Sequence, residues 1–335
     1  PGFRFSKERN TVVANVYYQH AVLDGVLNEN AKNEQKIKKD FDNVTYFLMT
    51  NIFFNKENSL RVHVSSSTDE PSLSQLQDIK DITNAQYVST GNSNLDQSYS
   101  HSVRAHYVNS NIEKGRTFML MGMFSTTQDY IGRSVYYNPS HEITGLDYTP
   151  LQYSTYENMD GQWSVRGMVN FGTPLGFMKC NLNLRAGVNY SVTPSMINGA
   201  INNASNMGYN FGAVLGSNIS ENVDFTIGWN GNYNLADNSL AAGNGKNEYF
   251  NHSAQASLKT IFWKGFTFTA NASYVQNIGY TNDYNDSYVL VNAYIGKKLF
   301  KNQLGEVLVG VNDLLNENAA FARTVGSGYT QNAWN

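Results

Sequence analysis

The chain has 335 residues, and its formal net charge of −3 excludes the basic field that nucleic acid would require. Charged residues make up 15%, compared with roughly 25% in soluble domains, whereas aromatic residues reach 13%. The single cysteine, Cys180, excludes an intrachain disulfide and a cysteine-built metal site. Mean hydropathy is −0.43, and no run approaches the ~18 apolar residues of a transmembrane helix. This composition suits a transmembrane β-barrel or a secreted all-β protein.

Thirteen segments of the chain are predicted to be β-strands. A strand that crosses a bilayer needs about 9–11 residues, and most of the segments meet this length. Proline is nearly absent from them, as expected where every backbone N–H must pair. In chain order the segments are 11–27, 43–54, 60–68, 98–109, 116–137, 162–172, 179–191, 208–217, 223–234, 250–262, 266–278, 287–298 and 305–312.

The segments alternate apolar and polar residues. In 223–234, Phe225, Ile227 and Trp229 occupy one face, while Asp224 and Thr226 occupy the other. Successive side chains of a strand point to opposite sides, so such a strand has one apolar and one polar face. Two further segments show the same pattern: 179–191 and 266–278. A β-sandwich would also alternate, although its strands are commonly near five or six residues long.

The breaks between the segments alternate in length. Short breaks occur at 55–59, 110–115, 173–178, 218–222, 263–265 and 299–304. Long polar breaks occur at 28–42, 69–97, 138–161, 192–207, 235–249 and 279–286. Bacterial transmembrane β-barrels have tight periplasmic turns and long extracellular loops. We therefore predict an antiparallel barrel in the outer membrane of a Gram-negative cell, in contact with its lipid and lipopolysaccharide.

Aromatic residues gather near the ends of the predicted strands. Rings with a polar edge suit the headgroup layer, so these residues are candidates for the two aromatic girdles of a barrel. The candidates are Tyr17, Tyr18, Phe53, Phe54, Tyr136, Tyr137, Phe171, Tyr190, Tyr233, Phe262, Trp263, Tyr274 and Phe300. Ordinary β-propensity accounts for part of this list.

Four stretches of the chain resemble the outer-membrane β-barrel family of Bacteroidota-type TonB-dependent receptors. Residues 71–77 (PSLSQLQ) and 91–95 (GNSNL) are similar to that family's "PS..QL … GNP.L.P.." signature, with Ser93 and Gln97 where the family often has proline. Residues 158–164 (NMDGQWS) resemble its "N.DG..S" entry to a strand. Residues 312–318 (NDLLNEN) with Arg323 resemble its "DLLNqN…R" segment. Their order and spacing are more specific than any one motif.

The resemblance implies the barrel portion of an importer. In that family a barrel of 22 strands encloses a plug that lies N-terminal to the barrel. About thirteen strands are visible here, so we expect residues 1–335 to be one barrel domain, the C-terminal part of such a barrel, with the plug and the last strand absent. Residues 1–10 contain no apolar segment of a signal peptide and no TonB box. They resemble a periplasmic turn leading into the first strand.

No catalytic, cofactor-binding or metal-binding residues are predicted, and no ligand-binding residue is identified. The six histidines are scattered, and alternation places His101 and His106 on opposite faces, so they cannot share a metal. Ser100 and Ser102 are neighbours of His101 in sequence only, which gives no hydrolase arrangement. The glycine-rich residues 242–246 lack the rest of a phosphate-binding motif. We therefore expect that the chain is not an enzyme.

Charged residues suggest where partners could bind. The charge run 29–40 falls in a long break and is expected to be a solvated extracellular loop, with an accessory lipoprotein or lipopolysaccharide as alternative contacts. Four cations are expected to face the lumen, where they could contact a plug, line a substrate path or pair with carboxylates such as Asp224. These are Arg104, Arg166, Arg185 and Lys259.

Two functions remain open from the sequence. As the resemblance implies, the first is TonB-dependent import of a nutrient ligand, with the TonB system acting through a plug not present in this chain. The second is a barrel that transports nothing and serves as an outer-membrane scaffold for surface lipoproteins or a secretion complex. A TonB box and a plug would favour the first function.

Overall fold

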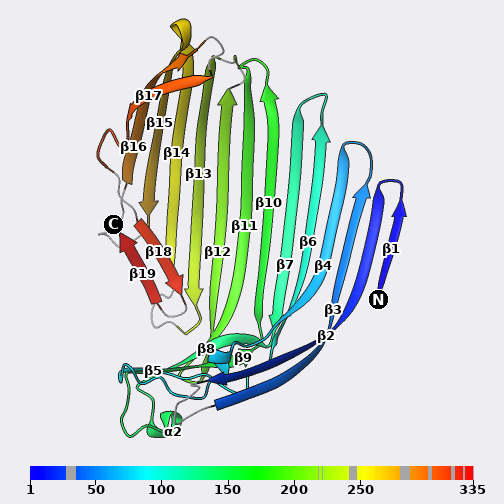
Figure 1. Ribbon diagram of the computed structural model, residues 1–335, viewed down its shortest axis with the longest axis vertical. Helices are drawn as coiled ribbons and strands as arrows, with labels where there is room; N and C mark the ends of the chain where they lie inside the picture. The colour runs from blue at the N-terminus through cyan, green and yellow to red at the C-terminus, as the bar shows by residue number, and fades with distance from the viewer. Residues whose placement is uncertain are drawn as a thin grey trace.

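The computed structural model describes residues 1–27, 35–217, 219–220, 222–240, 247–279, 287–300, 304–317, 321–326 and 329–334. Seventeen strands form one sheet, and two more form a separate hairpin (Figure 1). The strands of the sheet are β1 (Gly2–Lys7), β2 (Asn10–Leu27), β3 (Gln35–Phe53), β4 (Asn58–Asp69), β5 (Tyr87–Ser89), β6 (Ser98–Asn111), β7 (Arg116–Gln128), β8 (Tyr130–Tyr137), β9 (Gln152–Met159), β10 (Gln162–Leu175), β11 (Cys180–Ile197), β12 (Ala200–Ser217), β13 (Val223–Asn238), β14 (Asn247–Phe262), β15 (Phe266–Ile278), β16 (Ser287–Leu299) and β17 (Gly305–Val311). The separate hairpin is β18 (Phe321–Gly326) and β19 (Tyr329–Trp334).

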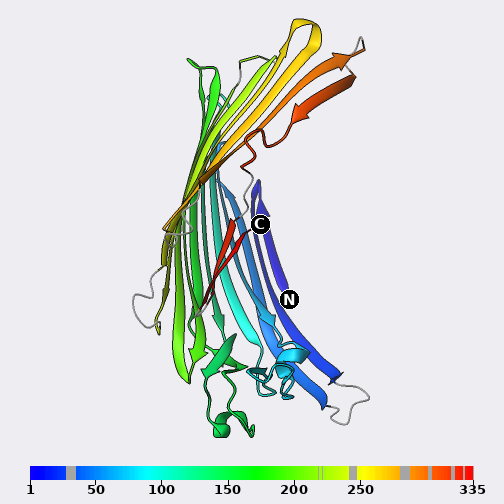
Figure 2. The ribbon, with the colours of Figure 1, turned by 90° about the vertical axis from the view of Figure 1, so that its left-hand side faces the viewer.

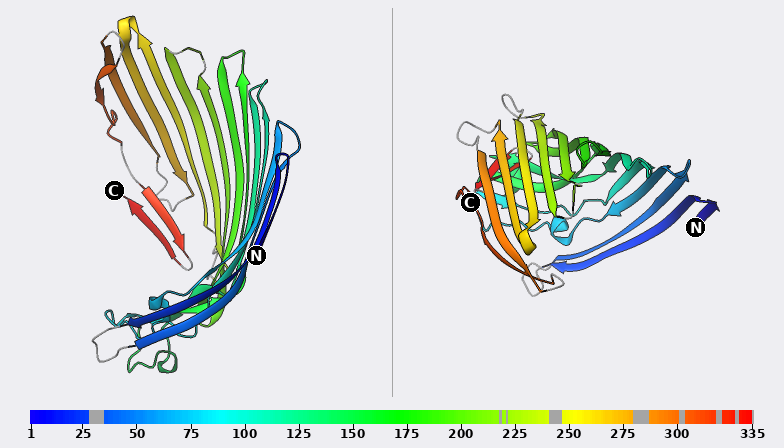
Figure 3. Two further views of the ribbon diagram at one scale, coloured as in Figure 1. Left: turned by 45° about the vertical axis from the view of Figure 1, so that its right-hand side comes forward. Right: turned by 90° about the horizontal axis from the view of Figure 1, so that it is seen from above.

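The body of the sheet is an antiparallel meander. Strands β1, β2, β3, β4, β6, β7 and β10 to β17 pair in that order, each with the next. The other three strands of the seventeen, β5, β8 and β9, lie at the long-loop end, which leaves fourteen in the meander. The sheet curves strongly, as Figure 2 and the right-hand view of Figure 3 show.

The predicted strand count of thirteen is wrong, although every one of the thirteen segments contains a strand. Residues 1–10 were expected to be a turn, but β1 pairs with β2 there. The segment 116–137 is two strands, because Asp129 has φ = 50° and ends β7. No described pairing joins β17 back to β1, so closure and the figure of 22 strands are not found in the described residues.

Two of the predicted long loops are partly strand. β3 begins at Gln35, so the charge run 29–40 is part strand, and its residues 29–34 lie outside the described residues. β11 and β12 extend through 192–207 and meet at Asn198 and Gly199. Both have positive φ (49° and 78°), as a tight Asn-Gly hairpin turn requires. The glycine-rich residues 242–246 also lie outside the described residues.

One face of the meander is apolar and exposed. We call it the lipid face. The opposite face of the same strands, to which every second side chain points, is the lumen face. Leu184, Ile227 and Trp229 lie on the lipid face, and Trp229 is 40% exposed. Between the aromatic girdles, the described lipid-face positions include no Asp, Glu, Lys or Arg. Lipid tails cannot solvate charge, so this face suits contact with hydrocarbon.

Aromatic side chains border the lipid face at both ends. At the long-loop end, Trp163 lies 5.1 Å from Tyr190, and Tyr209 lies 6.4 Å from Tyr233, measured between ring centroids. At the short-turn end, Trp263 stacks on Phe266 at 5.5 Å. Several girdle candidates are wrong: Tyr136 and Tyr137 lie on β8, which has left the meander, and Tyr17 and Phe53 face the lumen.

Two long loops fold together into a cap at the long-loop end (lower part of Figure 1). The cap comprises residues 69–97 and 129–161, with helices α1 (Leu73–Leu76) and α2 (His141–Thr144). Its core is Leu76 and Leu95, both 0% exposed, packed with Ile37 of β3. Lys39, on the lumen face of β3, donates to the carbonyl of Leu95 at 2.7 Å. The cap therefore packs against the lumen side of the sheet.

The search for membrane-spanning helices found none of sufficient length and hydrophobicity among the described residues.

Candidate functional site

The lumen face carries a group of basic side chains that we call the basic wall. It consists of Arg61, His63, Arg104, His106, Arg166 and Arg185. Strand register sets their neighbours: Arg104 lies opposite His63 on one side and Met123 on the other, and Met123 lies opposite Arg166. Directly opposed residues have Cβ atoms about 4.5–5.5 Å apart. The wall therefore runs across five adjacent strands: β4, β6, β7, β10 and β11.

Methionines fill the middle of the basic wall. Met119, Met121 and Met123 alternate along β7 on the lumen face, and Met168 of β10 lies opposite Met121. Thioethers are flexible and polarisable, so they adapt to irregular partners. The wall thus combines charge with an adaptable apolar surface.

A hollow adjoins the basic wall at Arg185. Its volume is about 620 Å³. The lining side chains include amides from four strands, namely Asn170, Asn181, Asn183, Asn230 and Gln255. Gly172 and Gly212 also line the hollow, and because they have no side chain they leave room in it. A Cβ on Gly212 would lie 3.6 Å from Nε of Arg185, so the guanidinium extends over this glycine.

The four predicted lumen cations lie on the lumen face but do not form one site. Arg104, Arg166 and Arg185 belong to the basic wall, whereas Lys259 lies apart, opposite Asp224 in the register of β13 and β14. The expected pairing with Asp224 is not an ion pair in the described chain; that carboxylate accepts the Ser217 hydroxyl at 3.0 Å. The sequence did not reveal the hollow, because it depends on which glycines face one another across strands.

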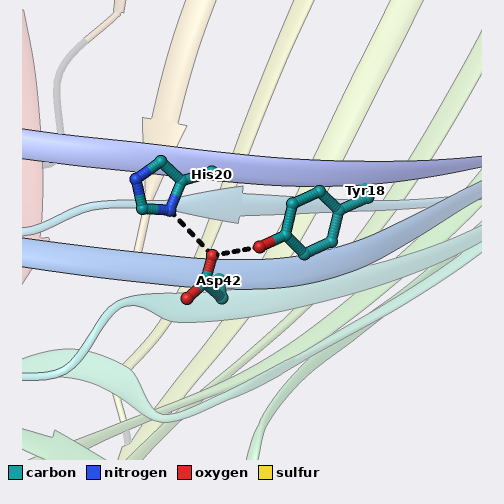
Figure 4. Close-up of polar contacts among 3 residues, drawn as sticks. All are labelled: Tyr18, His20 and Asp42. Carbon is teal, nitrogen blue, oxygen red and sulfur yellow. Dashed lines mark hydrogen bonds and ion pairs between the residues drawn. The ribbon is translucent and has the colours of Figure 1, made fainter.

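One contact between a histidine and a carboxylate has ion-pair geometry among the described residues, on the opposite face from the basic wall. His20 Nδ1 lies 2.8 Å from Oδ1 of Asp42, and the Tyr18 hydroxyl donates to the same oxygen at 2.6 Å (Figure 4). An imidazole held by a carboxylate can act as a general base where a hydroxyl nucleophile adjoins it. Within the described chain no serine or threonine is bonded to His20. These three side chains are exposed on the outer face of β2 and β3.

The other histidines follow strand alternation. His101 lies on the lipid side, 2.8 Å from the Tyr46 hydroxyl, whereas His106 belongs to the lumen face. No cluster of three or more His, Cys, Asp or Glu side chains suited to a metal ion occurs in the part of the chain that the structure describes.

The motifs at 71–77, 91–95 and 158–164 meet in the cap. Ser72 and Gln75 form a reciprocal capping box on α1, with Ser72 N–H donating to Gln75 Oε1 at 2.9 Å. The N–H of Asn92 donates to the Gln75 carbonyl at 2.6 Å. Oδ1 of Asn158 accepts the backbone N–H of Asp96 at 2.8 Å, and Nδ2 of Asn158 donates to the backbone carbonyl of Asp96 at 2.9 Å. These motifs hold the long loops together rather than forming a chemical site.

The remaining motif lies at the far edge of the sheet. Asp313 accepts the N–H of Glu317 at 3.1 Å, and Glu317 accepts the N–H of Val289 on β16 at 2.9 Å. This turn fastens the chain after β17 to β16. Asn318 and the side chain of Arg323 lie outside the described residues.

The cap also contains a local polar turn. Thr83 donates its hydroxyl to Asp81 at 2.6 Å and its N–H at 3.0 Å. These bonds stabilise the carboxylate and lower the pKa of Asp81 below its usual value.

Gly91→Ala is expected to destabilise the cap by about 1–3 kcal/mol, because a Cβ there overpacks a closed site. It would stand 2.4 Å from the Gln75 carbonyl oxygen and 2.7 Å from the backbone of Gln77. Protease cleavage within 73–97 on the full-length protein in outer membranes measures the effect. Gly122→Ala is the control, since no atom lies within 4 Å of that Cβ. Equal cleavage of the two variants contradicts this account.

Comparison with known families decides the class of the protein. The model of the outer membrane protein beta-barrel family matches residues 18–246. The chain belongs to this family. The predicted outer-membrane location is thereby confirmed, and so is the barrel-type, all-β antiparallel fold. The narrower assignment to TonB-dependent receptors goes beyond the family match. No curated protein matches the chain.

Among solved structures, this chain is similar to LpxR from Salmonella typhimurium. The two share 11% identity, and the match covers 75% of this chain and 87% of LpxR with a TM-score of 0.23. The prediction that the chain is not an enzyme is corrected, because the matched protein is an outer-membrane enzyme. A match at this identity and TM-score assigns no activity to the chain.

Proposed function

We propose that this family member forms the barrel part of a TonB-dependent receptor that imports a nutrient ligand. The observation that supports the proposal is the polar lumen face, where the basic wall and the hollow leave arginine and amide groups open to an occupant. The motif resemblance at 71–77, 91–95, 158–164 and 312–318 agrees with it. In such a receptor the TonB system would act through a plug outside this chain.

The barrel residues would have three tasks in import. Inter-strand hydrogen bonds satisfy the backbone in lipid, where unpaired groups are costly. The cap, packed on the lumen side through Lys39 and Ile37, would narrow the entrance from outside the cell. The lumen face would then offer hydrogen bonds and positive charge to the entering ligand.

Capture by TonB tests this proposal on the native protein. The full polypeptide is extracted from outer membranes in detergent, weighed intact, and passed over immobilised TonB periplasmic domain. We expect specific retention and a mass about twice the 37.4 kDa of this chain. An outer-membrane barrel without a TonB box serves as the control. No retention together with a mass near 37.4 kDa would contradict import through TonB.

A scaffold for surface lipoproteins is a second candidate, favoured by the outer surface of the cap. Ile82, Tyr87 and Leu151 are large apolar side chains exposed there, and the backbone of Gln86 accepts from Gln152, next to Leu151. Apolar groups exposed together often mark protein contacts. Co-purification of a lipoprotein that Leu151→Glu abolishes, without retention on TonB, would favour the scaffold.

A further inference from the structure

The basic wall lacks acidic partners among the described residues. On the lumen faces of β4, β6, β7, β10 and β11, the only carboxylate is Asp69. Asp69 is eight residues along β4 from Arg61, roughly 26 Å at the usual rise of a strand. Four guanidinium groups thus share this surface, and within the described chain none of them forms an ion pair. Their summed potential attracts anions into the lumen.

The carboxylates on the neighbouring lumen surface are already engaged. Asp224 accepts a hydroxyl from Ser217, and Glu306 accepts the hydroxyl of Thr267 at 2.6 Å. Neither forms an ion pair within the described chain. Arg104, Arg166 and Arg185 are all exposed, so their guanidinium groups are accessible to a ligand.

Arg185 is the charged member of the hollow. Asn170 lies directly opposite it on β10, and Gly212 lies opposite it on β12. A guanidinium binds a carboxylate through two parallel N–H···O bonds, which a neutral group cannot match. Asn and Gln amides both donate and accept, so they complement hydroxyl groups. The lining therefore favours an anion that also bears hydroxyls.

We propose that this hollow binds a small, hydroxyl-bearing carboxylate, with Arg185 as its counter-ion. The rest of the basic wall attracts the anion, and the surrounding amides bind its hydroxyls. Gly212 keeps the floor open beside the guanidinium. This inference rests on the proposed function only in that import would bring the ligand to the lumen.

The test is calorimetric titration of the full-length protein, purified from outer membranes in detergent, at low salt. Digalacturonate is the anionic probe and maltose is a neutral disaccharide of similar size. We expect digalacturonate to bind at least about tenfold more tightly than maltose, and Arg185→Gln to weaken it by about tenfold or more. Lys259→Gln is the control: it removes a lumen cation outside the hollow and should leave binding unchanged.

A second variant separates the hollow from general charge. Gly212→Leu fills the floor without changing charge, and it should also weaken digalacturonate binding. Circular dichroism and heat-modifiable migration on gels verify that each variant is folded.

Three results would overturn the inference: no binding of digalacturonate, equal binding of maltose, or equal losses in Arg185→Gln and Lys259→Gln. If Arg185 instead pairs with an acidic residue elsewhere in the full protein, the wild type will not bind the probe and Arg185→Gln will lower the melting temperature. Binding in detergent requires no TonB. Failure of the import proposal would therefore leave this result intact, and the reverse also holds.

Discussion

Leu184→Arg is expected to destabilise the folded protein in a bilayer by about 2–4 kcal/mol, the cost of a cation near the middle of the lipid face. Leu184 is 42% exposed and lies on β11, six residues from Tyr190 of the long-loop girdle and four residues from Cys180 at the short-turn end of the strand. Phe171 lies directly opposite Leu184, so it is too far inside the lipid face to be the girdle residue predicted from the sequence. The residues directly opposite Leu184 on the two adjacent strands are Phe171 and Ala213, so neither could pair with the introduced guanidinium. The adjacent Asn183 points into the lumen, where an arginine remains hydrated.

Asn183→Arg is therefore the matched control, with an expected change within about 0.5 kcal/mol. The measurement is urea-induced unfolding of the full-length protein refolded into phosphatidylcholine vesicles. The same variants in detergent micelles should differ less, since micelles deform around charge. Equal destabilisation by the two substitutions would mean that the assignment of the faces is wrong.

The two faces were predictable from the sequence because alternation is a local property. Phe225, Ile227 and Trp229 lie on the lipid face, as their spacing indicates, and Thr226 faces the lumen. The lumen position of Arg104, Arg166 and Arg185 follows from the same rule. Whether these arginines meet carboxylates does not, because that depends on the register between strands.

One local signal in the sequence argues against the predicted long loop at 192–207. Asn198-Gly199 is a strong hairpin signal, whereas the polar residues that flank it favour a loop. Beyond the membrane both faces of a strand meet water or protein, so alternation fades while pairing continues. β1 carries no such signal, because its six residues lie between polar ends and resemble a turn.

The cap could not be predicted from periodicity. Its core joins Ile37, Leu76 and Leu95, which are far apart in sequence and stand singly among polar residues. The motifs in 71–97 and 158–164 resemble segments of a known family, and that resemblance does not indicate that they bind one another. The hydrogen bonds between Asn158 and Asp96 supply that connection.

Leu76→Ala is expected to lower the stability of the cap by about 2–5 kcal/mol, because it removes a fully buried side chain and leaves a cavity. Ile37 of β3 and Leu95 would lose their packing partner. The barrel itself is held by inter-strand bonds and should remain folded. Local opening of the cap is thus expected without global unfolding.

Hydrogen exchange on the full-length protein in detergent measures this opening. Amides of 73–97 should exchange at least about thirtyfold faster in Leu76→Ala, since 1.4 kcal/mol corresponds to tenfold. Ile82→Ala is the control within the same loop, because Ile82 is 56% exposed and should have little effect. If exchange in β10 to β13 accelerates as much as exchange in the cap, the cap and these strands are one cooperative unit, which contradicts local opening.

Because the cap packs on the lumen side of β3, its opening should also increase access to the hollow. Faster association of the anionic probe with Leu76→Ala would measure this access.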